Sequence, residues 1–361
     1  MKKIALVLIL ALACVFVVSA EVSLTGEFDY GFMAGDPDAG PGFTGKFDKI
    51  ELDFAVTMDD YNTFKAEIED ADGSNDLTAG AAGNLHLGYA EIVTDWGAQL
   101  GLPIGIVSTV GYDGFSIGDD FDITGWSLED LGGIGLATEG AGQLEIMPND
   151  MITLLLAGTF DADVDNNPGI LVGGTFQNDA LGITVGFVSS DDTYAHNIFY
   201  TEDKYEMDLG NGMGLALSAS LAYDLDYDVA PSLDGNGDGS VTAADVNQEV
   251  EYGAGAFFTV AAAGFGVSMN GNDDDAINQL GLDATYALTD ALSADVGTIF
   301  DLTDDADDNF LGLDVSATYA IGGAAYTLGY LYSDGNGKAA NYNSIPALAD
   351  GGVYFKVCVD F

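Results

Sequence analysis

Arginine is absent from this chain of 361 residues, and lysine supplies all 8 basic side chains against 59 acidic ones, for a formal net charge of −51. Nucleic-acid binding depends on Lys and Arg neutralising phosphates, so this composition excludes nucleic acid as a partner. Histidine occurs only as His86 and His196, neither in a recognisable nucleophile or metal motif, and we do not expect an enzyme. Proline totals 7 and no Pro-rich or Ser-rich linker divides the chain, which favours one continuous architecture.

Long hydrophobic runs are also missing, except at the N-terminus. Residues 1–20 combine two lysines, an unbroken apolar run and a small-residue end at Ala20, which is typical of a secretory signal peptide cleaved after Ala20. A lipoprotein-type anchor at Cys14 is the alternative, although the apolar run continues past that cysteine. Cleavage would leave Cys358 without an intrachain disulfide partner. Downstream, nothing reaches the roughly 18 apolar residues of a membrane helix, so we expect the periplasm, the exterior or the outer membrane.

Hydrophobic residues nevertheless make up 48% of the chain, and this fraction excludes a disordered acidic protein. They alternate with polar residues, which is the period of a β-strand. From Val22 to Phe32 the apolar side chains fall on even positions, and the same alternation recurs in segments 50–58, 215–223, 280–286 and 311–319. Many of these segments hold about ten residues, enough to cross a bilayer as tilted strands.

Long and short connections alternate along the chain. Short turns are expected at 59–62, 95–97, 148–150, 178–180, 209–212, 262–263, 289–290 and 321–323. Tight turns on one side and free loops on the other are typical of membrane barrels. We therefore predict an all-β fold for residues 21–361, a transmembrane antiparallel up-and-down β-barrel of about 18 strands, with about 16 as the alternative. A soluble β-sandwich would also alternate, but aromatic residues such as Tyr223 and Tyr286 gather near segment ends, as in an interfacial girdle.

The C-terminal strand carries the most specific resemblance. Residues 352–361 place an apolar side chain at every second position counting back from the terminal Phe361. This pattern resembles the assembly signal of Gram-negative outer-membrane barrel proteins. Together with the leader and the alternating strands, it makes the whole mature chain similar to the porins.

The resemblance implies an outer-membrane channel for passive diffusion of small hydrophilic solutes, surrounded by outer-membrane lipid, with a homotrimer left open. In porins the third outer loop commonly folds into the barrel and forms the constriction. By that resemblance, loop 113–131 would place Asp119, Asp120 and Asp122 at the narrowest point, although an ordinary solvated acidic loop is the alternative. Porins also tend to set a basic cluster opposite this loop. A chain without arginine departs from that pattern, which favours cations as the preferred solutes.

Acidic residues also occupy the positions opposite in parity to the apolar ones. If the apolar side chains face lipid, then Glu51, Asp53, Glu249 and Glu251 line the interior. A lining of one sign raises the local concentration of cations and repels anions. For each single residue, a place near a strand end in bulk water stays the alternative.

A calcium-binding pattern lies in the long loop 229–247. Residues 234–245 fit D-x-N-x-D-G with an acid at the twelfth position, and Gly239 permits the sharp turn. The candidate ligands are Asp234, Asn236, Asp238, Ser240 and Asp245. Aspartate at the twelfth position resembles dockerin loops, but a dockerin has two such loops and only one is present here. We expect Ca²⁺ as a structural cofactor of this loop, with a plain Gly/Asp-rich turn as the alternative.

Two rival functions stay open at this point. One is a closed structural or adhesive surface barrel whose calcium-stabilised acidic loops carry the activity. The other is a substrate-specific sugar-type channel of about 18 strands, which would line its path with aromatic side chains. Inward aromatics such as Phe257 are scarce in the sequence, which favours the general porin.

Overall fold

The alternating segments form long antiparallel strands in a computed structural model, which describes residues 22–34, 43–70, 85–112, 115–118, 123–125, 128, 131, 133–136, 141–159, 169–190, 196–225, 250–272, 279–302, 310–333 and 352–360. The elements, in chain order, are β1 Val22–Ala34, β2 Phe43–Thr57, β3 Asn62–Asp70, β4 Leu85–Asp95, α2 Trp96–Leu100, β5 Gly105–Tyr112, β6 Phe115–Ile117, β7 Ile134–Leu136, β8 Ala141–Asn149, β9 Ile152–Thr159, β10 Ile170–Gln177, β11 Leu181–Ser190, β12 His196–Gly210, β13 Met213–Asp224, β14 Val250–Val260, β15 Ala263–Asn272, β16 Gln279–Thr289, β17 Leu292–Asp301, β18 Phe310–Ile321, β19 Ala324–Ser333 and β20 Gly352–Asp360.

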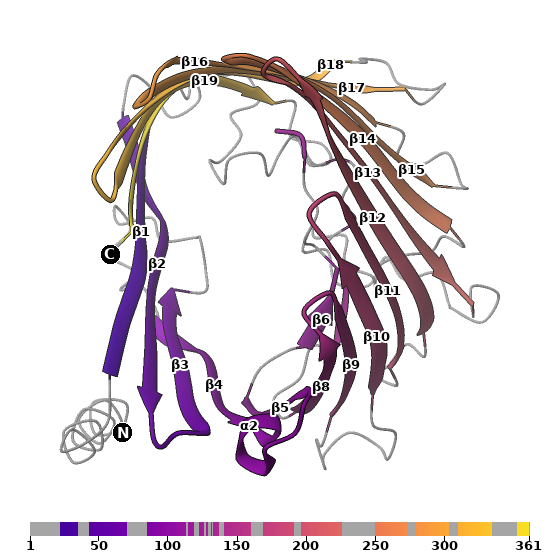
Figure 1. The fold of residues 1–361 in the computed structure, drawn as a ribbon. Helices are drawn as coiled ribbons and strands as arrows, with labels where there is room; N and C mark the ends of the chain where they lie inside the picture. Colours follow the sequence, from indigo (N-terminus) through magenta and orange to yellow (C-terminus); the bar gives the residue numbers. More distant parts are fainter. Residues whose placement is uncertain are drawn as a thin grey trace.

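The strands form one closed 18-stranded sheet in sequence order, with β6 and β7 paired separately. Each strand is antiparallel to the next, and β5 pairs directly with β8. The ring closes where β1 pairs with β20, and the register there runs from Glu27 opposite Asp360 to Ala34 opposite Val353. Figure 1 shows these strands arranged in a ring. This closure leaves the sheet without a free edge.

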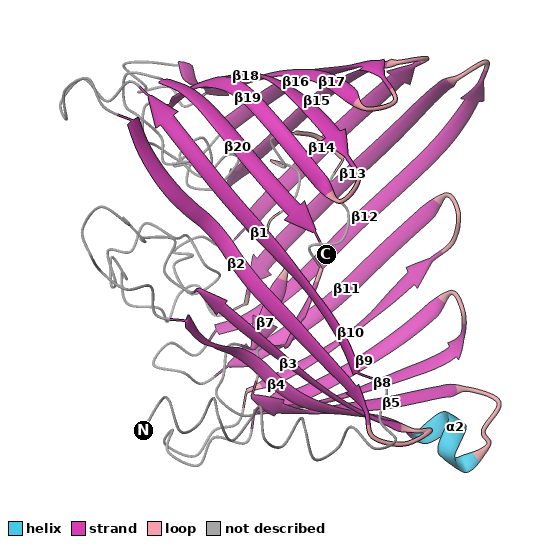
Figure 2. Ribbon diagram, turned by 90° about the vertical axis from the view of Figure 1, so that its left-hand side faces the viewer, coloured by secondary structure: helices cyan, strands magenta, loops and turns pink. Residues whose placement is uncertain are grey.

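Short turns join the strands at one end of the ring, and α2 lies among them (Figure 2). In the turn between β2 and β3, the Asp59 carboxylate accepts hydrogen bonds from the backbone N–H groups of Tyr61 and Asn62. The helix α2 is capped by Asp95, whose side chain accepts from the Ala98 N–H. Within the described ranges, no helix is long and apolar enough to cross a membrane.

The two faces of the sheet differ as the alternation predicts. Leu156 and Val172 are cross-strand partners that are 50% and 46% exposed. Their neighbours Ala157 and Leu171, which are also partners, are 2% and 0% exposed. One face therefore presents an apolar surface outward, and the other packs inside the ring.

The structure confirms the predicted all-β barrel with 18 strands, and the alternatives of 16 strands and a sandwich are wrong. Two details differ from the predicted boundaries. The turn expected at 95–97 holds the helix α2 and extends to residue 104. The third long connection, expected at 113–131, continues to residue 140 and contains β6 and β7, because its apolar side chains pack inside the ring.

Candidate functional site

The connection between β5 and β8 turns back into the ring of strands. Its strands β6 and β7 pair with each other, and four apolar side chains of this hairpin are nearly buried: Phe115, Ile117, Ile134 and Leu136. They pack against Leu171, Val188 and Tyr200 of β10, β11 and β12. Figure 1 shows β6 on the inner side of these strands. The face of the sheet that carries Leu171, Val188 and Tyr200 is therefore the inner wall.

Glycines on the inner wall make room for this hairpin. A Cβ added at Gly173 would stand 2.5 Å from the Ile117 Cδ1, and one at Gly186 would stand 2.6 Å from the Ile117 Cγ2. Real Cβ atoms do not approach other atoms this closely, so a larger residue at either position would push the hairpin away. The strands and the loop are matched in shape at this contact.

A second part of the same connection reaches another part of the wall. Leu128 is fully buried and packs with Ile299 of β17 and Leu311 of β18. The connection therefore touches the wall at β10–β12 through its hairpin and at β17–β18 through Leu128. Its described residues therefore contact the inner wall at two separate places.

Acidic side chains line the inner wall on most strands. The cross-strand register places the following carboxylates on the inner face: Glu51, Asp53, Glu67, Glu91, Glu145, Glu202, Glu206, Asp208, Asp224, Glu251, Asp283, Asp295, Asp301 and Asp314. Among the side chains that the structure describes, the inward lysines are Lys65, Lys204 and Lys356. The wall thus carries a large excess of negative charge.

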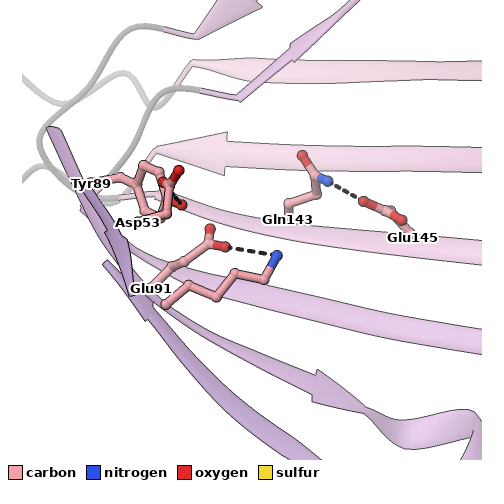
Figure 3. A network of polar contacts seen from close by, with 6 residues as sticks. Asp53, Tyr89, Glu91, Gln143 and Glu145 are labelled. Atoms are coloured by element: carbon pink, nitrogen blue, oxygen red, sulfur yellow. Dashed lines mark hydrogen bonds and ion pairs between the residues drawn. The ribbon is translucent and has the colours of Figure 1, made fainter. Parts of the chain in front are cut away.

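Three of these acids converge on β2 and β3. Carboxylate oxygens of Glu51, Asp53 and Glu67 all lie within 4.8 Å of one another, and Asp53 and Glu67 are direct cross-strand partners. The Tyr89 hydroxyl of β4 donates a hydrogen bond of 3.1 Å to the Asp53 Oδ1 (Figure 3). Carboxylate oxygens are the ligands that Ca²⁺ and Mg²⁺ take, so this cluster is where the wall could hold a divalent cation.

Two of the inward lysines form ion pairs with neighbouring acids. The Lys65 Nζ lies 3.5 Å from the Glu91 Oε1, and these residues are partners across β3 and β4. The Lys204 Nζ lies 2.8 Å from the Glu206 Oε1. In the close-up, the side chains of Glu91 and Glu145 point to the same side of the sheet as Asp53 (Figure 3). Pairing neutralises much of the small positive charge on the wall, so the excess of carboxylates persists.

No protein-family model and no curated protein sequence matches the chain. Solved structures do match it along almost its whole length. Two engineered variants of the Rhodopseudomonas blastica porin are each 16% identical, with TM-scores of 0.53, and the alignments cover 94% of this chain and 100% of theirs. A structure described as "Asymmetric conductivity of engineered proteins" gives the same values.

The chain has the fold of a porin. On this fold the inward-turning connection from β5 to β8 is the third long one, at the place where the porin resemblance predicted an inward loop. Its described residues do lie inside the ring, whereas the predicted constriction residues Asp119, Asp120 and Asp122 lie outside the described residues.

Other predicted site residues divide in the same way. Glu51, Asp53 and Glu251 lie on the inner wall of the porin fold, and the first two belong to the acidic cluster. Glu249 lies outside the described residues, and so do all the candidate calcium ligands: Asp234, Asn236, Asp238, Ser240 and Asp245.

Sequence reasoning missed several residues of the wall. Tyr89 donates to the predicted Asp53, and Glu91 forms an ion pair with Lys65. Both lie on β4, which pairs with β3 across a bulge between Ala66 and Ile68, and this bulge obscures the alternation. Glu202 lies in β12, where Asp203 interrupts the apolar positions. The inward positions of β11 and β13 are clear from their own alternation, and pairing β12 with these strands would have identified Glu202 as inward.

Proposed function

We propose that this protein is an outer-membrane porin, a water-filled channel for passive diffusion of small hydrophilic solutes with a preference for cations. The observation that carries the proposal is the inner wall, where carboxylates from β2 to β18 greatly outnumber the lysines. A wall of one sign raises the concentration of cations inside a channel and repels anions. The described residues of the connection from β5 to β8 lie inside the ring, so they would narrow the path and bring solutes close to this wall.

Recording of single channels in a planar bilayer tests the proposal. Folded protein should give discrete conductance steps, and a KCl gradient should give a reversal potential of the sign expected for K⁺. A reversal potential that favours chloride would refute the cation preference. Protein that inserts without conductance would refute the channel and leave the structural surface barrel as the better explanation.

Cys358 provides a native reporter of the same preference. It lies on β20 at an inward position, partly exposed, and it is the one cysteine in residues 21–361. A cationic methanethiosulfonate reagent should therefore modify it, and lower the conductance, faster than an anionic reagent of similar size. Cys358→Ser is the matched control and should respond to neither reagent. Equal rates for both reagents would contradict an acidic lumen.

The proposal includes the calcium loop within residues 229–247. Its support is the spacing of Asp234, Asn236, Asp238, Ser240 and Asp245, which suits a hard cation. Calcium should raise the melting temperature of the wild type but not of a variant with both Asp234→Ala and Asp238→Ala. A wild type without such a rise would show that this loop is an ordinary turn.

The proposal also includes export and membrane assembly. Residues 1–20 would be removed after Ala20, which leaves Val22, the first residue of β1, next to the new N-terminus. Sequencing of the mature N-terminus in the outer-membrane fraction tests both cleavage and location. Native mass spectrometry in detergent distinguishes a homotrimer from a monomer.

A further inference from the structure

A cavity of about 420 Å³ lies between the inward loop and the inner wall. Ile123 and Gly125 of the loop line one side of it, and strand β14 together with strands β16 to β20 supplies the other. The wall side includes Phe257, Asp283, Asp295, Asp314, Tyr354 and Lys356. A volume of this size suits a small organic molecule. The inference drawn from this cavity rests on the proposed channel function and adds a class of solute to it.

Glycines shape this cavity by letting three large side chains lie flat along the wall. A Cβ at Gly264 would stand 2.4 Å from the Phe257 ring. One at Gly266 would stand 2.3 Å from the Asp283 carboxylate, and one at Gly329 would stand 2.5 Å from the Tyr354 ring. With larger residues at these positions, the three side chains would stand up into the lumen. The wall is therefore recessed where the loop approaches it.

The polar groups of the cavity are arranged across neighbouring strands. Thr285, Asp295 and Ser316 are consecutive cross-strand partners on β16, β17 and β18. Asp314 is held by the Tyr354 hydroxyl, which donates to its two carboxylate oxygens at 3.0 and 3.2 Å. The floor thus offers carboxylate and hydroxyl oxygens at fixed positions.

The charges and spacing select the class of ligand. The cavity holds three carboxylates and one ammonium, so a cation is favoured over an anion. Among the described residues, the acids whose oxygens converge within 4.8 Å are Glu51, Asp53 and Glu67, and none of these lines the cavity. The three carboxylates of the cavity therefore do not converge on one point. An elongated molecule can span them, and Phe257 and Ile123 give its carbon chain an apolar contact.

We propose that this cavity is a binding subsite for small aliphatic cations that carry primary ammonium groups, such as diamines, on their way through the channel. Each ammonium group brings several N–H donors for the carboxylate and hydroxyl oxygens of the floor. Lys356 lines one side of the cavity, and its positive charge disfavours an ammonium group of the ligand at that side. The subsite slows the passage of such solutes relative to K⁺.

Single-channel recording of the full chain with 1,5-diaminopentane as the probe tests the subsite. The wild type should show reversible interruptions of the K⁺ current at millimolar diamine. Asp295→Asn, which removes one charge with little change of shape, should raise the half-blocking concentration about tenfold, because charge-assisted hydrogen bonds are lost. Asp295→Glu should keep most of the block. Asp208 is an inward acid of β12 that does not line the cavity. Asp208→Asn should therefore change the half-blocking concentration by no more than about twofold.

Tetramethylammonium separates a subsite from the general field of the wall, since it carries charge without N–H donors. Equal block by tetramethylammonium and the diamine, or an unchanged block in Asp295→Asn, would overturn the subsite. Conductance without any diamine block would overturn it too while leaving the channel proposal intact. A wild type without conductance would overturn the channel function and the subsite together.

Discussion

Asp203 lies on the outer face of the barrel, halfway along β12, and replacing it should stabilise the protein. Its cross-strand partners are Ile183 and Ala219, and its neighbours on the same side of β12 are Thr201 and Tyr205. Tyr205 is 40% exposed on this outer face. Within the described part of the chain, no hydrogen bond or ion pair joins the Asp203 carboxylate. In a membrane this face meets lipid, so the carboxylate would lie near the middle of the bilayer without a partner.

The expected gain follows from the cost of a charge at this depth. A basic residue on the lipid face at the midplane destabilises a barrel by about 2–4 kcal/mol, and an acidic residue by less. We therefore assign about 1–2 kcal/mol to the Asp203 carboxylate. Asp203→Leu also adds apolar surface, which contributes separately. Thr201→Leu on the same strand adds comparable surface without removing a charge, so the difference between the two variants isolates the carboxylate.

Urea titration of the barrel in phospholipid vesicles, followed by tryptophan fluorescence and by gel mobility, measures both variants. Asp203→Leu should raise the free energy of unfolding more than Thr201→Leu does, by the amount assigned to the carboxylate. If Asp203→Leu is no more stable than Thr201→Leu, the Asp203 side chain does not face lipid without a partner. Such a result would instead indicate that the carboxylate meets a polar partner in the assembled protein.

Three further substitutions test other parts of the molecule. Tyr354→Phe removes the hydroxyl bound to the buried Asp314, and the free energy of unfolding in the same urea assay should fall by about 1.5–3 kcal/mol, whereas an unchanged midpoint would contradict this. Gly186→Val should displace the inner hairpin and change the single-channel conductance while circular dichroism retains the strand signal; unchanged conductance would count against the loop's role. Hydrogen bonding to Asn62 lowers the pKa of Asp59 below 3.8, so its contribution to stability is present above that value and lost as pH falls through the lower folded value. The wild type should therefore melt above Asp59→Asn at pH 7, and the gap should shrink below about pH 4; a constant gap would contradict this.

The sequence predicted the barrel well because each strand carries its own evidence. In a membrane barrel, lipid outside and water inside impose alternation on every strand. The strand β16 has this alternation, with Leu280 and Leu282 pointing outward beside the inward Asp283. Such a pattern can be recognised without knowledge of the partner strand. The strand number followed from counting these segments and their turns.

The inner loop and the wall clusters could not be predicted in the same way. Phe115 and Ile117 form only a short apolar segment, and their burial depends on Gly173 and Gly186, far along the chain. The convergence of the acidic cluster depends on the register between β2 and β3. These features arise from contacts between distant segments, which local periodicity does not report.

Pairing of the first strand with the last governs when this barrel can be completed. Phe28 of β1 lies opposite Val359 of β20, so almost the entire chain separates two residues that must meet. A chain that still lacks β20 has two unpaired strand edges, and such edges are sites of aggregation. Because β20 consists of the 9 residues from Gly352 to Asp360, a nascent chain would need protection at both edges until these residues arrive. The last strand of the sequence therefore determines whether the finished chain becomes a closed ring or an open sheet.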